Sequence, residues 1–445
     1  MSKRRKPLNP ARVMASGFLG LIVIGSLLLS LPQAHEGAGI AYIDALFTAT
    51  SAVCVTGLVV VDTGTFFNPF GQGLIMIMIF IGALGFMTMS TLIFIFLGRQ
   101  ISLRDRIIVK EALHQESMAD LVPLVKAIFV IALLFIIIGT SLLCFRFIPD
   151  LGYGQGVFFA AFHAVSAFGN AGFDLFGNYV SLTLSPTDYL TNGTILFLFI
   201  IGGLGFTVIL ELIRRFRHRK HLSLHSRLVL IISASLLVSG TILVLLLEHN
   251  NPDTMGNLPI GAQLFAALFT SATARTAGFS VLDTGMLNYS SLLILMVLMF
   301  IGASPTSTGG GVKTTTFGLV LITLVSMVRG RHEPVLFLRR LPAYHIMKAI
   351  SIIIAAAALI FTTTFLMTLF ENHDFMALFF EAFSAFGTVG LSSGITPELS
   401  NPSKIALIAT MFCGRIGPVT LLVALAQKKP KDDAIKYPEE HLMIG

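Results

Sequence analysis

The chain has 445 residues, of which 55% are apolar and only 12% are charged. Soluble domains carry about a quarter charged residues, so this composition excludes a soluble globular protein and indicates a polytopic membrane protein. The formal net charge of +7 does not indicate nucleic-acid binding, because the basic residues gather in a few segments between apolar runs.

Apolar runs long enough to cross a bilayer occur in pairs along the chain. The first follows a basic arm and resembles a signal peptide, but its roughly 20 apolar residues exceed the 7–15 of a cleaved signal, so we interpret it as a span. One run of each pair opens a unit and the other closes it. The opening runs are residues 11–31, 121–148, 228–247 and 349–370, and the closing runs are residues 73–97, 194–213, 292–328 and 405–425.

A shorter apolar segment lies between the two runs of each pair. About 12 helical residues reach roughly 18 Å, about half of a bilayer, so each segment is predicted to be a re-entrant half-helix. These segments are residues 42–53, 156–168, 261–273 and 375–386. The predicted fold class is therefore an all-α polytopic membrane protein with four tandem span, pore-helix, span repeats, giving eight spans around a central pore.

A short motif recurs after each half-helix. Its clearest copies are FEAFSAFGTVGL at residues 380–391 and FHAVSAFGNAGF at residues 162–173. Looser copies place glycines in register in the other two units, and the four glycines are Gly57, Gly172, Gly278 and Gly390. Their separations of 115, 106 and 112 residues indicate a duplicated membrane module rather than a solenoid.

A second landmark follows these glycines by 25, 30, 24 and 24 residues, at Gly82, Gly202, Gly302 and Gly414. We interpret Gly82, Gly85, Gly202 and Gly205 as helix-packing glycines, which membrane helices use freely. The two landmarks together predict five parts of the chain. These are repeat 1 over residues 11–115, repeat 2 over 119–224, repeat 3 over 225–340, repeat 4 over 343–427, and a cytoplasmic tail over 428–445.

Charge asymmetry predicts the topology. The arm, the tail and three connecting loops hold 25 lysines and arginines, whereas the opposite side holds three, Arg146, Arg275 and Lys404. The positive-inside rule places both termini in the cytoplasm and makes the protein a multi-pass plasma-membrane protein whose half-helices enter from outside. The outer segments also carry 13 acidic residues, which either concentrate cations at the mouth or reflect ordinary outer loops.

Four re-entrant loops around one axis would line a pore, because non-helical backbone at membrane depth must be buried in protein or face water. Each half-helix directs its partly negative C-terminal end inward, and the following backbone carbonyls can replace a cation's hydration shell. Glycine suits this position because it tolerates dihedrals that are costly for other residues. The predicted selectivity filter, with a cation at its carbonyls, is Val55, Thr56, Gly57, Asn170, Ala171, Gly172, Thr276, Ala277, Gly278, Thr388, Val389 and Gly390.

The third closing run is interrupted by three glycines, a proline and four hydroxyl residues, which cannot remain a regular lipid-facing helix. Residues 303–314 are therefore predicted to form a loop inside the pore region, below the filter. A phosphate-binding loop is excluded there, because Val312 occupies a required glycine position and no strand precedes it. Arg415 lies near the middle of the last span, where a charge costs roughly 2.5–3.5 kcal/mol, so it is predicted to be functional.

Four such units, each with one filter glycine, resemble the Trk/Ktr/HKT superfamily of potassium-translocating subunits over essentially residues 11–427, and most closely the bacterial Ktr-type membrane subunit. In that superfamily, glycine in all four repeats accompanies potassium selectivity. The resemblance implies an intramembrane gate loop with Arg415 facing it beneath the filter. The predicted gate is Ser304, Thr306, Thr308, Gly309, Gly310, Gly311, Lys313 and Arg415.

The predicted function is potassium uptake through a gated, K⁺-selective pathway. The resemblance further implies a homodimer, surrounded by membrane lipids, above a cytosolic ring of KtrA/KtrC-like regulator-of-conductance subunits. ATP or ADP would bind that partner and no cofactor would bind this chain; K⁺ is the transported ion and Na⁺ a candidate activator. The apolar end of the tail, Leu442–Gly445, is predicted to dock on a neighbouring subunit.

Two alternative classes remain to be weighed. An intramembrane enzyme is not expected, because paired histidines, nucleophile motifs and carboxylate pairs are absent from the spans, and the isolated His163 and Glu381 fit hydrogen-bonded structural roles. No zinc or disulfide framework is expected from the dispersed Cys54, Cys144 and Cys413. A Na⁺/K⁺-coupled secondary symporter is the closer competitor, since such proteins also use repeats and broken helices.

Overall fold

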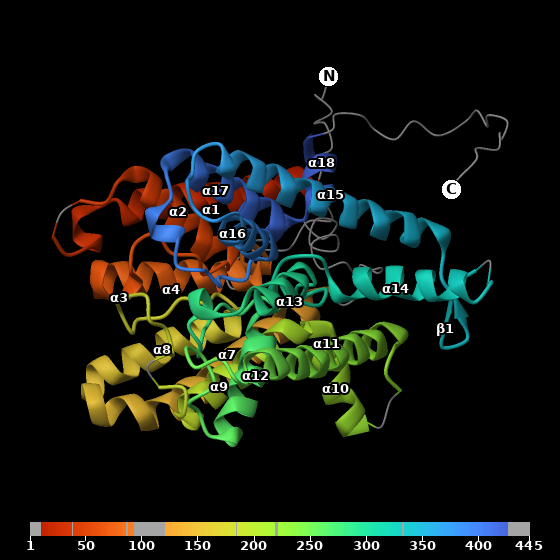
Figure 1. Cartoon of the computed structure of the whole chain (residues 1–445), viewed down its shortest axis with the longest axis horizontal. Coiled ribbons are helices and arrows are strands. Elements are labelled where there is room, and N and C mark those ends of the chain that lie inside the picture. The colour runs from red at the N-terminus through yellow and green to blue at the C-terminus, as the bar shows by residue number, and fades with distance from the viewer. Residues whose placement is uncertain are drawn as a thin grey trace.

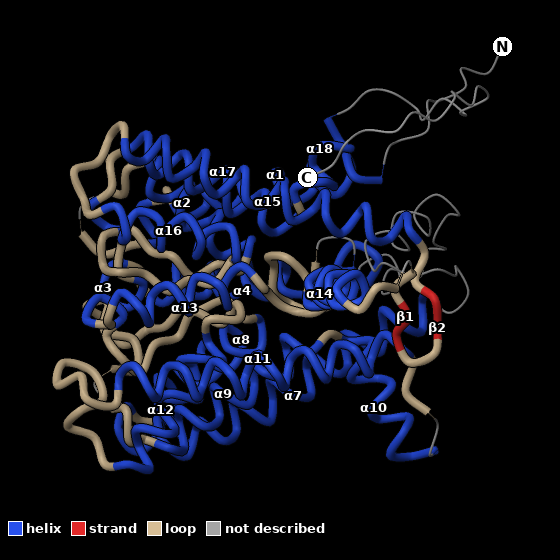
Figure 2. Tube along the Cα trace, turned by 45° about the vertical axis from the view of Figure 1, so that its right-hand side comes forward, coloured by secondary structure: helices blue, strands red, loops and turns tan. Residues whose placement is uncertain are grey.

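The computed structural model describes residues 10–37, 39–85, 88–92, 121–183, 185–218, 221–331 and 333–425. Most long helices run along a common direction, with the connecting loops gathered toward the ends of the molecule (Figure 1, Figure 2). Most of the predicted connection between repeats 1 and 2, the tail 428–445 and the predicted docking of Leu442–Gly445 lie outside the described residues.

Four long apolar helices open the four predicted repeats. They are α1 (Pro10–Leu29), α7 (Leu121–Leu151), α11 (Leu224–Glu248) and α15 (Ala343–Thr368), and each is long and apolar enough to cross a membrane. A fifth span is obtained if α9 (Tyr189–Leu204) and α10 (Phe206–His218), which meet at a bend of 98°, are counted as one. The full set of eight spans stays a prediction.

Each opening helix packs against a short helix, as expected for a half-helix. The short helices are α2 (Tyr42–Cys54), α8 (Tyr153–Gly169), α12 (Ile260–Thr273) and α16 (Phe375–Gly387). The phenylalanines with the most completely buried side chains lie largely on these helices or directly after the motif glycines. The apolar core is therefore centred on the short helices rather than on the membrane-facing ones.

Each closing helix packs against the short helix of the next repeat. Thus α4 (Pro69–Leu84) contacts α8, α9 contacts α12, α13 (Tyr289–Phe300) contacts α16, and α17 (Asn401–Ile416) returns to contact α2. The last contact joins the fourth repeat to the first, so the four units close into a ring. A chain with four like modules can close in this way because every junction buries the same pair of surfaces.

All four closing segments are interrupted, whereas the sequence predicted an interruption only in the third. Helices α4, α9 and α17 end at Gly85, Gly205 and Gly417, whose φ angles are +82°, +92° and +95°. Short helices α10 and α18 (Pro418–Leu425) follow two of these breaks. A left-handed residue cannot continue a right-handed helix, and glycine adopts it at little cost.

The packing interpretation is confirmed for Gly82 and Gly202 and is wrong for Gly85, whereas Gly205 packs closely against Pro305 of the loop rather than against a helix. A Cβ built on Gly82 would lie 2.1 Å from the carbonyl oxygen of Val53, at the end of α2, so this glycine permits close helix contact. Gly85 has no described atom within 4 Å of such a Cβ, and its role is the backbone turn. Gly82 and Gly85 therefore have different roles, whereas Gly205 combines a backbone turn with a close contact.

Many outer acidic side chains connect helix ends. Asp188 caps α9 by accepting from the backbone of Thr191, and it also forms an ion pair with Arg146. Burial alone would raise the pKa of Asp188, but the hydrogen bonds from Thr191 and Arg146 hold that pKa below its ordinary value. Glu371 likewise accepts from both the backbone and the hydroxyl of Ser400 at the start of α17. Helix capping thus accounts for part of the acidic excess.

Smaller elements complete the connections. They are the turns η1 (Pro32–Ala34), η2 (Thr284–Met286) and η3 (Thr396–Glu398), the short helix α3 (Thr63–Phe66), and the helix α14 (Thr314–Val328) that completes the third closing segment. Strands β1 (Val335–Leu336) and β2 (Arg339–Arg340) form an antiparallel hairpin between α14 and α15, pairing Val335 with Arg340 and Leu336 with Arg339.

Candidate functional site

The four motif glycines meet around one axis in repeat order. A Cβ built on Gly57 would lie 2.4 Å from the carbonyl oxygen of Ala171 and 3.1 Å from the Cα of Gly172. The corresponding Cβ on Gly172 would lie 2.8 Å from the Cα of Gly278, and that on Gly390 would lie 3.0 Å from the Cα of Gly57. The ring therefore closes from the fourth repeat to the first, with no room for a side chain on the glycines.

Carbonyl oxygens of the residue before each glycine line this ring. The carbonyl of Thr56 would lie 2.3 Å from a Cβ on Gly390, and the carbonyl of Val389 would lie 2.5 Å from a Cβ on Gly278. Ala171 and Ala277 present their carbonyls to the neighbouring glycines in the same way. The site thus consists of backbone oxygens from four repeats, which is the kind of ligand set that replaces the hydration shell of an alkali cation.

The backbone of each filter triplet alternates between positive and negative φ. The first residue is left-handed in every repeat, although none is glycine, and the φ angles are +58° at Val55, +57° at Asn170, +77° at Thr276 and +50° at Thr388. The glycines have φ angles between +69° and +95°. Left-handed conformations cost non-glycine residues roughly 1–2 kcal/mol, so their recurrence at one position indicates a constraint imposed by the site.

Three of these left-handed residues are also helix C-caps. Val55, Asn170 and Thr388 directly follow α2, α8 and α16 and donate their backbone N–H groups to the last turn. The carbonyl ends of these helices consequently stop at the predicted filter, where their partial negative charge would stabilise a cation. In the third repeat α12 instead ends at Ala274, two residues before Thr276, so the four units are not identical.

A hydroxyl on each short helix supports the filter strand that follows it. Ser51 Oγ accepts from the backbone N–H of Gly57 at 3.0 Å, and Ser384 Oγ accepts from that of Gly390 at 3.1 Å. In the other two repeats the hydroxyl donates instead, to the carbonyl oxygen of the residue after the glycine. The donors are Ser166 to Phe173 and Thr273 to Phe279, both at 2.6 Å.

The segment 301–313 is a loop, where the sequence predicted one over residues 303–314, and it contacts the filter residues. Its two ends are held together, because Ile301 and Val312 form a parallel bridge and Val312 N donates to Phe300 O. The first part of the loop is bound to α9 in the closing segment of repeat 2, since Ser304 N donates to Gly203 O at 3.1 Å. The glycines of the loop are required by contact rather than by flexibility alone; a Cβ on Gly309 would lie 2.1 Å from Thr276 Oγ1.

Three of the four left-handed filter residues contact the loop through their side chains. Thr308 Oγ1 donates to Asn170 Oδ1 at 2.8 Å, and Asn170 Nδ2 donates to Thr276 Oγ1 at 3.3 Å. Gly310 N donates to Thr388 Oγ1 at 2.9 Å. All these groups are buried, so the filter and the loop form one hydrogen-bonded unit.

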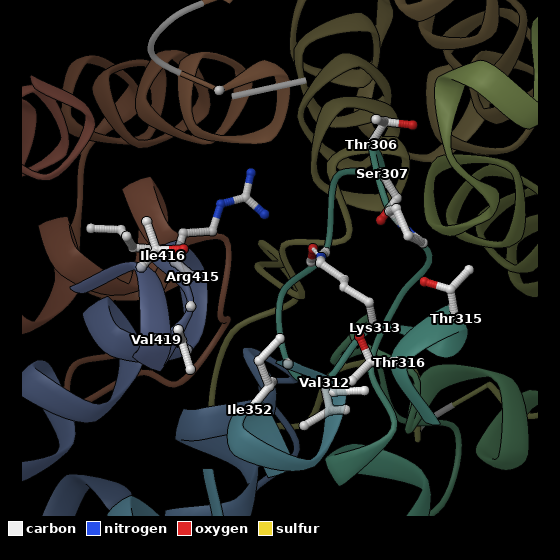
Figure 3. A pocket seen from close by; sticks show the side chains of 18 of the residues that line it. Thr306, Ser307, Val312, Lys313, Thr315, Thr316, Ile352, Arg415, Ile416 and Val419 are labelled. Carbon is white, nitrogen blue, oxygen red and sulfur yellow. Dashed lines mark hydrogen bonds between the residues drawn. The ribbon is translucent and has the colours of Figure 1, made fainter. Parts of the chain in front are cut away.

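Arg415 bridges the loop and the first repeat. Its guanidinium donates to the carbonyl oxygens of Thr308 in the loop and Gly82 in α4, and Figure 3 shows it reaching from α17 toward the loop. These contacts place the arginine against the loop, which it was expected to face from the family resemblance. Because both acceptors are neutral carbonyls, the positive charge of the arginine is not cancelled by them.

A cavity of about 610 Å³ lies on the opposite side of the loop from the filter. The loop residues Thr306, Ser307 and Lys313 line one part of it, and Arg415 lines another (Figure 3). Lys313 donates its ammonium to Gly309 O at 2.6 Å, so it is bound to the loop itself. The loop and Arg415 therefore separate the four-glycine ring from this cavity.

One predicted position was wrong. Arg275 was counted among the outer basic residues, but it follows α12 beside the filter and donates to Ser233 near the middle of α11, at 3.2 Å to the carbonyl and 3.1 Å to the hydroxyl. An arginine at that depth is tolerated because the protein supplies acceptors. The structure brings the predicted filter and gate residues close together. Val55 differs from the other three left-handed filter residues, because none of the described hydrogen bonds links it to the loop.

The four hydroxyl residues that support the filter were not predicted from the sequence. Ser51, Ser166 and Ser384 all lie six residues before their glycine, and this constant spacing is the signal that could have identified them. In the third repeat the spacing is shorter by one residue, because Thr273 precedes Gly278 by five. That difference hides the pattern in an ungapped alignment.

The sequence of this chain is similar to those of known transport proteins over nearly its whole length. The profile of the TrkH family, described as a cation transport protein, matches residues 11–437. The chain is 42% identical over 438 residues to the Ktr system potassium uptake protein B of Bacillus subtilis, which covers 98% of this chain and 97% of that protein. It is 39% identical over 452 residues to the potassium/sodium uptake protein NtpJ of Enterococcus hirae, covering 100% and 99%.

A solved structure supports the architecture. The crystal structure of the potassium transporter TrkH from Vibrio parahaemolyticus aligns with a TM-score of 0.75 over 96% of this chain and 86% of that one. The sequence identity between the two is 18%, so this likeness concerns the fold alone.

Proposed function

Because this chain belongs to the TrkH family of cation transport proteins, we propose that it carries K⁺ into the cell through the ring of four glycines. The residues around that ring would form the selectivity filter, and the outer mouth would admit the ion. Residues 301–313 and Arg415 would form the gate on the cytoplasmic side. The chain would cross the membrane eight times, with both termini in the cytoplasm.

The observation that carries the proposal is the closed ring of glycines, in which each glycine lies against the carbonyl of the residue before the next glycine. A Cβ on any of the four would meet backbone atoms of the next repeat within about 3 Å, so the narrowest part of the path is built from main-chain atoms. Main-chain carbonyls suit K⁺ because they coordinate without a fixed negative charge and let the ion leave again. No enzyme chemistry is needed for this function.

The test is uptake measured in cells that lack their own K⁺ transporters. Wild-type protein should restore growth at low external K⁺ and should take up Rb⁺ in preference to Na⁺. Protein that reaches the membrane but restores neither growth nor Rb⁺ uptake would refute the proposal.

A gate is supported by the position of the loop between the filter and the cavity. Thr308 and Gly310 hold the loop against the filter, and Arg415 adds a positive charge under the path. Such a barrier must move before ions pass in quantity. Control by a separate cytosolic chain that binds ATP or ADP is part of the proposal, together with a homodimer of this protein.

A coupled Na⁺/K⁺ symporter remains the second candidate, favoured by the name of the Enterococcus hirae relative as a potassium/sodium uptake protein. Reversal potentials in liposomes under imposed gradients separate the two. A K⁺ channel follows the K⁺ gradient alone, whereas a symporter shifts with both gradients.

A further inference from the structure

Glu381 is a completely buried carboxylate on α16, the short helix of the fourth repeat. It accepts hydrogen bonds from Ser392 Oγ at 2.6 Å, Ser393 N at 3.0 Å and Thr396 Oγ1 at 2.8 Å. Ser393 Oγ adds a longer contact at 3.4 Å. All these partners belong to the segment 392–396, which follows the fourth filter glycine and runs into the turn η3, so the carboxylate holds this segment to the helix.

The position of Glu381 relative to the filter follows from the helix. Ser384 lies three residues later, hence on the same face of α16, and it accepts from the backbone N–H of Gly390. Ser392 is two residues beyond that glycine, and two residues of chain span at most about 7 Å. The carboxylate therefore lies on the order of 10 Å from the fourth filter glycine, on its outer side.

The partners of Glu381 favour its ionised form. Four donors aimed at two carboxylate oxygens stabilise the negative charge, whereas a protonated acid would have to give one of these bonds up. Among the ion pairs of the described residues, none involves Glu381. Burial opposes this charge, and the hydrogen bonds act against that effect. In the ionised form the charge of Glu381 is compensated by these hydrogen bonds and acts on a cation nearby.

The equivalent positions in the other repeats carry no acid. In the second repeat His163 takes this place, three residues before Ser166, and its Nε2 accepts from Leu175 N at 3.3 Å beyond the filter glycine. In the first and third repeats the place is taken by threonines, Thr48 and Thr270. The fourth repeat alone has an anionic group behind its filter strand at this position.

We infer that the Glu381 carboxylate raises the affinity of the outer end of the filter for external K⁺. The inference rests on the proposed K⁺ pathway and names the group that sets its half-saturating concentration. Opposite charges about 10 Å apart, in an effective dielectric constant of about 20, change a binding constant by about tenfold. Glu381 does not touch the ion; it acts through the field at the filter and through the strand it holds.

The test is the rate of Rb⁺ uptake against external concentration for Glu381→Gln, which keeps shape and removes charge. The half-saturating concentration should rise by about three- to tenfold, equivalent to about 0.7–1.4 kcal/mol. The maximal rate per protein in the membrane should stay within about twofold. Glu381→Asp, which restores the charge, should return the half-saturating concentration toward the wild-type value.

Glu248 provides the matched control. It is equally buried at the end of α11 and accepts from Asn251, Thr254, Asn288 and Ser291, but it joins α11 to the start of α13 rather than to the filter. Glu248→Gln should leave the half-saturating concentration unchanged, even if it lowers the amount of folded protein. An equal shift in Glu248→Gln would show a general effect of burying an amide and would overturn the inference.

Two further outcomes are decisive. A folded Glu381→Gln protein with the wild-type half-saturating concentration would refute the inference while leaving the K⁺ pathway intact, because uptake itself would persist. If Glu381→Gln does not reach the membrane, Glu381→Thr decides the matter, since it removes the charge and introduces the residue that repeats 1 and 3 carry at this position, Thr48 and Thr270. That variant should raise the half-saturating concentration by about three- to tenfold, and an unchanged value would refute the inference.

Discussion

Asn170 and Thr308 lie 138 residues apart in the chain and share a buried hydrogen bond of 2.8 Å, from the hydroxyl of the threonine to the amide oxygen of the asparagine. Asn170 is the left-handed first residue of the second filter strand, and Thr308 belongs to the loop below it. This bond connects the filter directly to the proposed gate. The state of the loop and the shape of the filter should therefore be coupled.

Asn170→Ala and Thr308→Val should each weaken the attachment of the loop. Both leave a buried polar partner unsatisfied, which costs about 1–3 kcal/mol, and the double variant should cost less than the sum because the shared bond is lost only once. The measurement is K⁺ flux and thermal stability for the four proteins of the cycle. Additive effects in both would show that the two side chains do not act together.

Gly57→Ser, Gly172→Ser, Gly278→Ser or Gly390→Ser should impair K⁺ uptake or its preference over Na⁺ by tenfold or more. The serine must adopt a positive φ, and its Cβ would meet backbone atoms of the next repeat within about 3 Å. Competition between Rb⁺ and Na⁺ measures this, with membrane insertion checked in parallel. Unchanged selectivity in all four inserted proteins would contradict the filter assignment.

Arg415→Ala should increase flux and reduce its dependence on any regulatory partner. The substitution removes the bridge between Thr308 O and Gly82 O and a positive charge from the path. Deletion of residues 306–310 should act in the same direction. Flux through purified protein in liposomes is the readout, and a fall in flux from correctly folded protein would identify the loop as a scaffold rather than a gate.

Lys404 and Asp44 should stabilise the closure of the four-repeat ring. The ammonium of Lys404 on α17 lies 2.7 Å from Asp44 Oδ1 on α2, with side-chain exposures of 10% and 20%. Lys404→Met leaves Asp44 with an uncompensated charge, and because the pair is not fully buried we expect a loss of about 1–3 kcal/mol. Thermal unfolding in detergent tests this. The double variant Lys404→Met, Asp44→Asn should be more stable than Lys404→Met alone.

Gly205→Ala should be more harmful than Gly85→Ala, although both glycines end a closing helix with similar φ. A Cβ at Gly85 meets no described atom within 4 Å, so the cost is that of a positive φ with an extended ψ, about 1–3 kcal/mol. A Cβ at Gly205 would also lie 2.4 Å from the carbonyl oxygen of Pro305 in the loop. Comparing the stability and flux of the two variants tests the distinction, and equal effects would contradict it.

The repeat pattern and the recurrent glycines with positive φ could be predicted from the sequence, because both depend on local chemistry. A glycine that must adopt a positive φ cannot easily be replaced, so it can be recognised when it recurs in related segments. The four that recur here are Gly57, Gly172, Gly278 and Gly390. The break at residues 301–313 was equally visible, since a run of glycine, proline and hydroxyl residues cannot continue an apolar helix. The half-helices could be predicted in the same way, because segments of about 12 residues are too short to cross a bilayer.

Contacts between segments far apart in the chain were decided only by the tertiary structure. The sequence could not show that Arg275 turns inward to Ser233, because a basic residue beside a loop is ambiguous until its acceptor is known. Nor could it distinguish the packing role of Gly82 from the turning role of Gly85, since both are glycines in an apolar run. The left-handed φ of Val55 is imposed by the filter that surrounds it, and valine has no intrinsic preference for it.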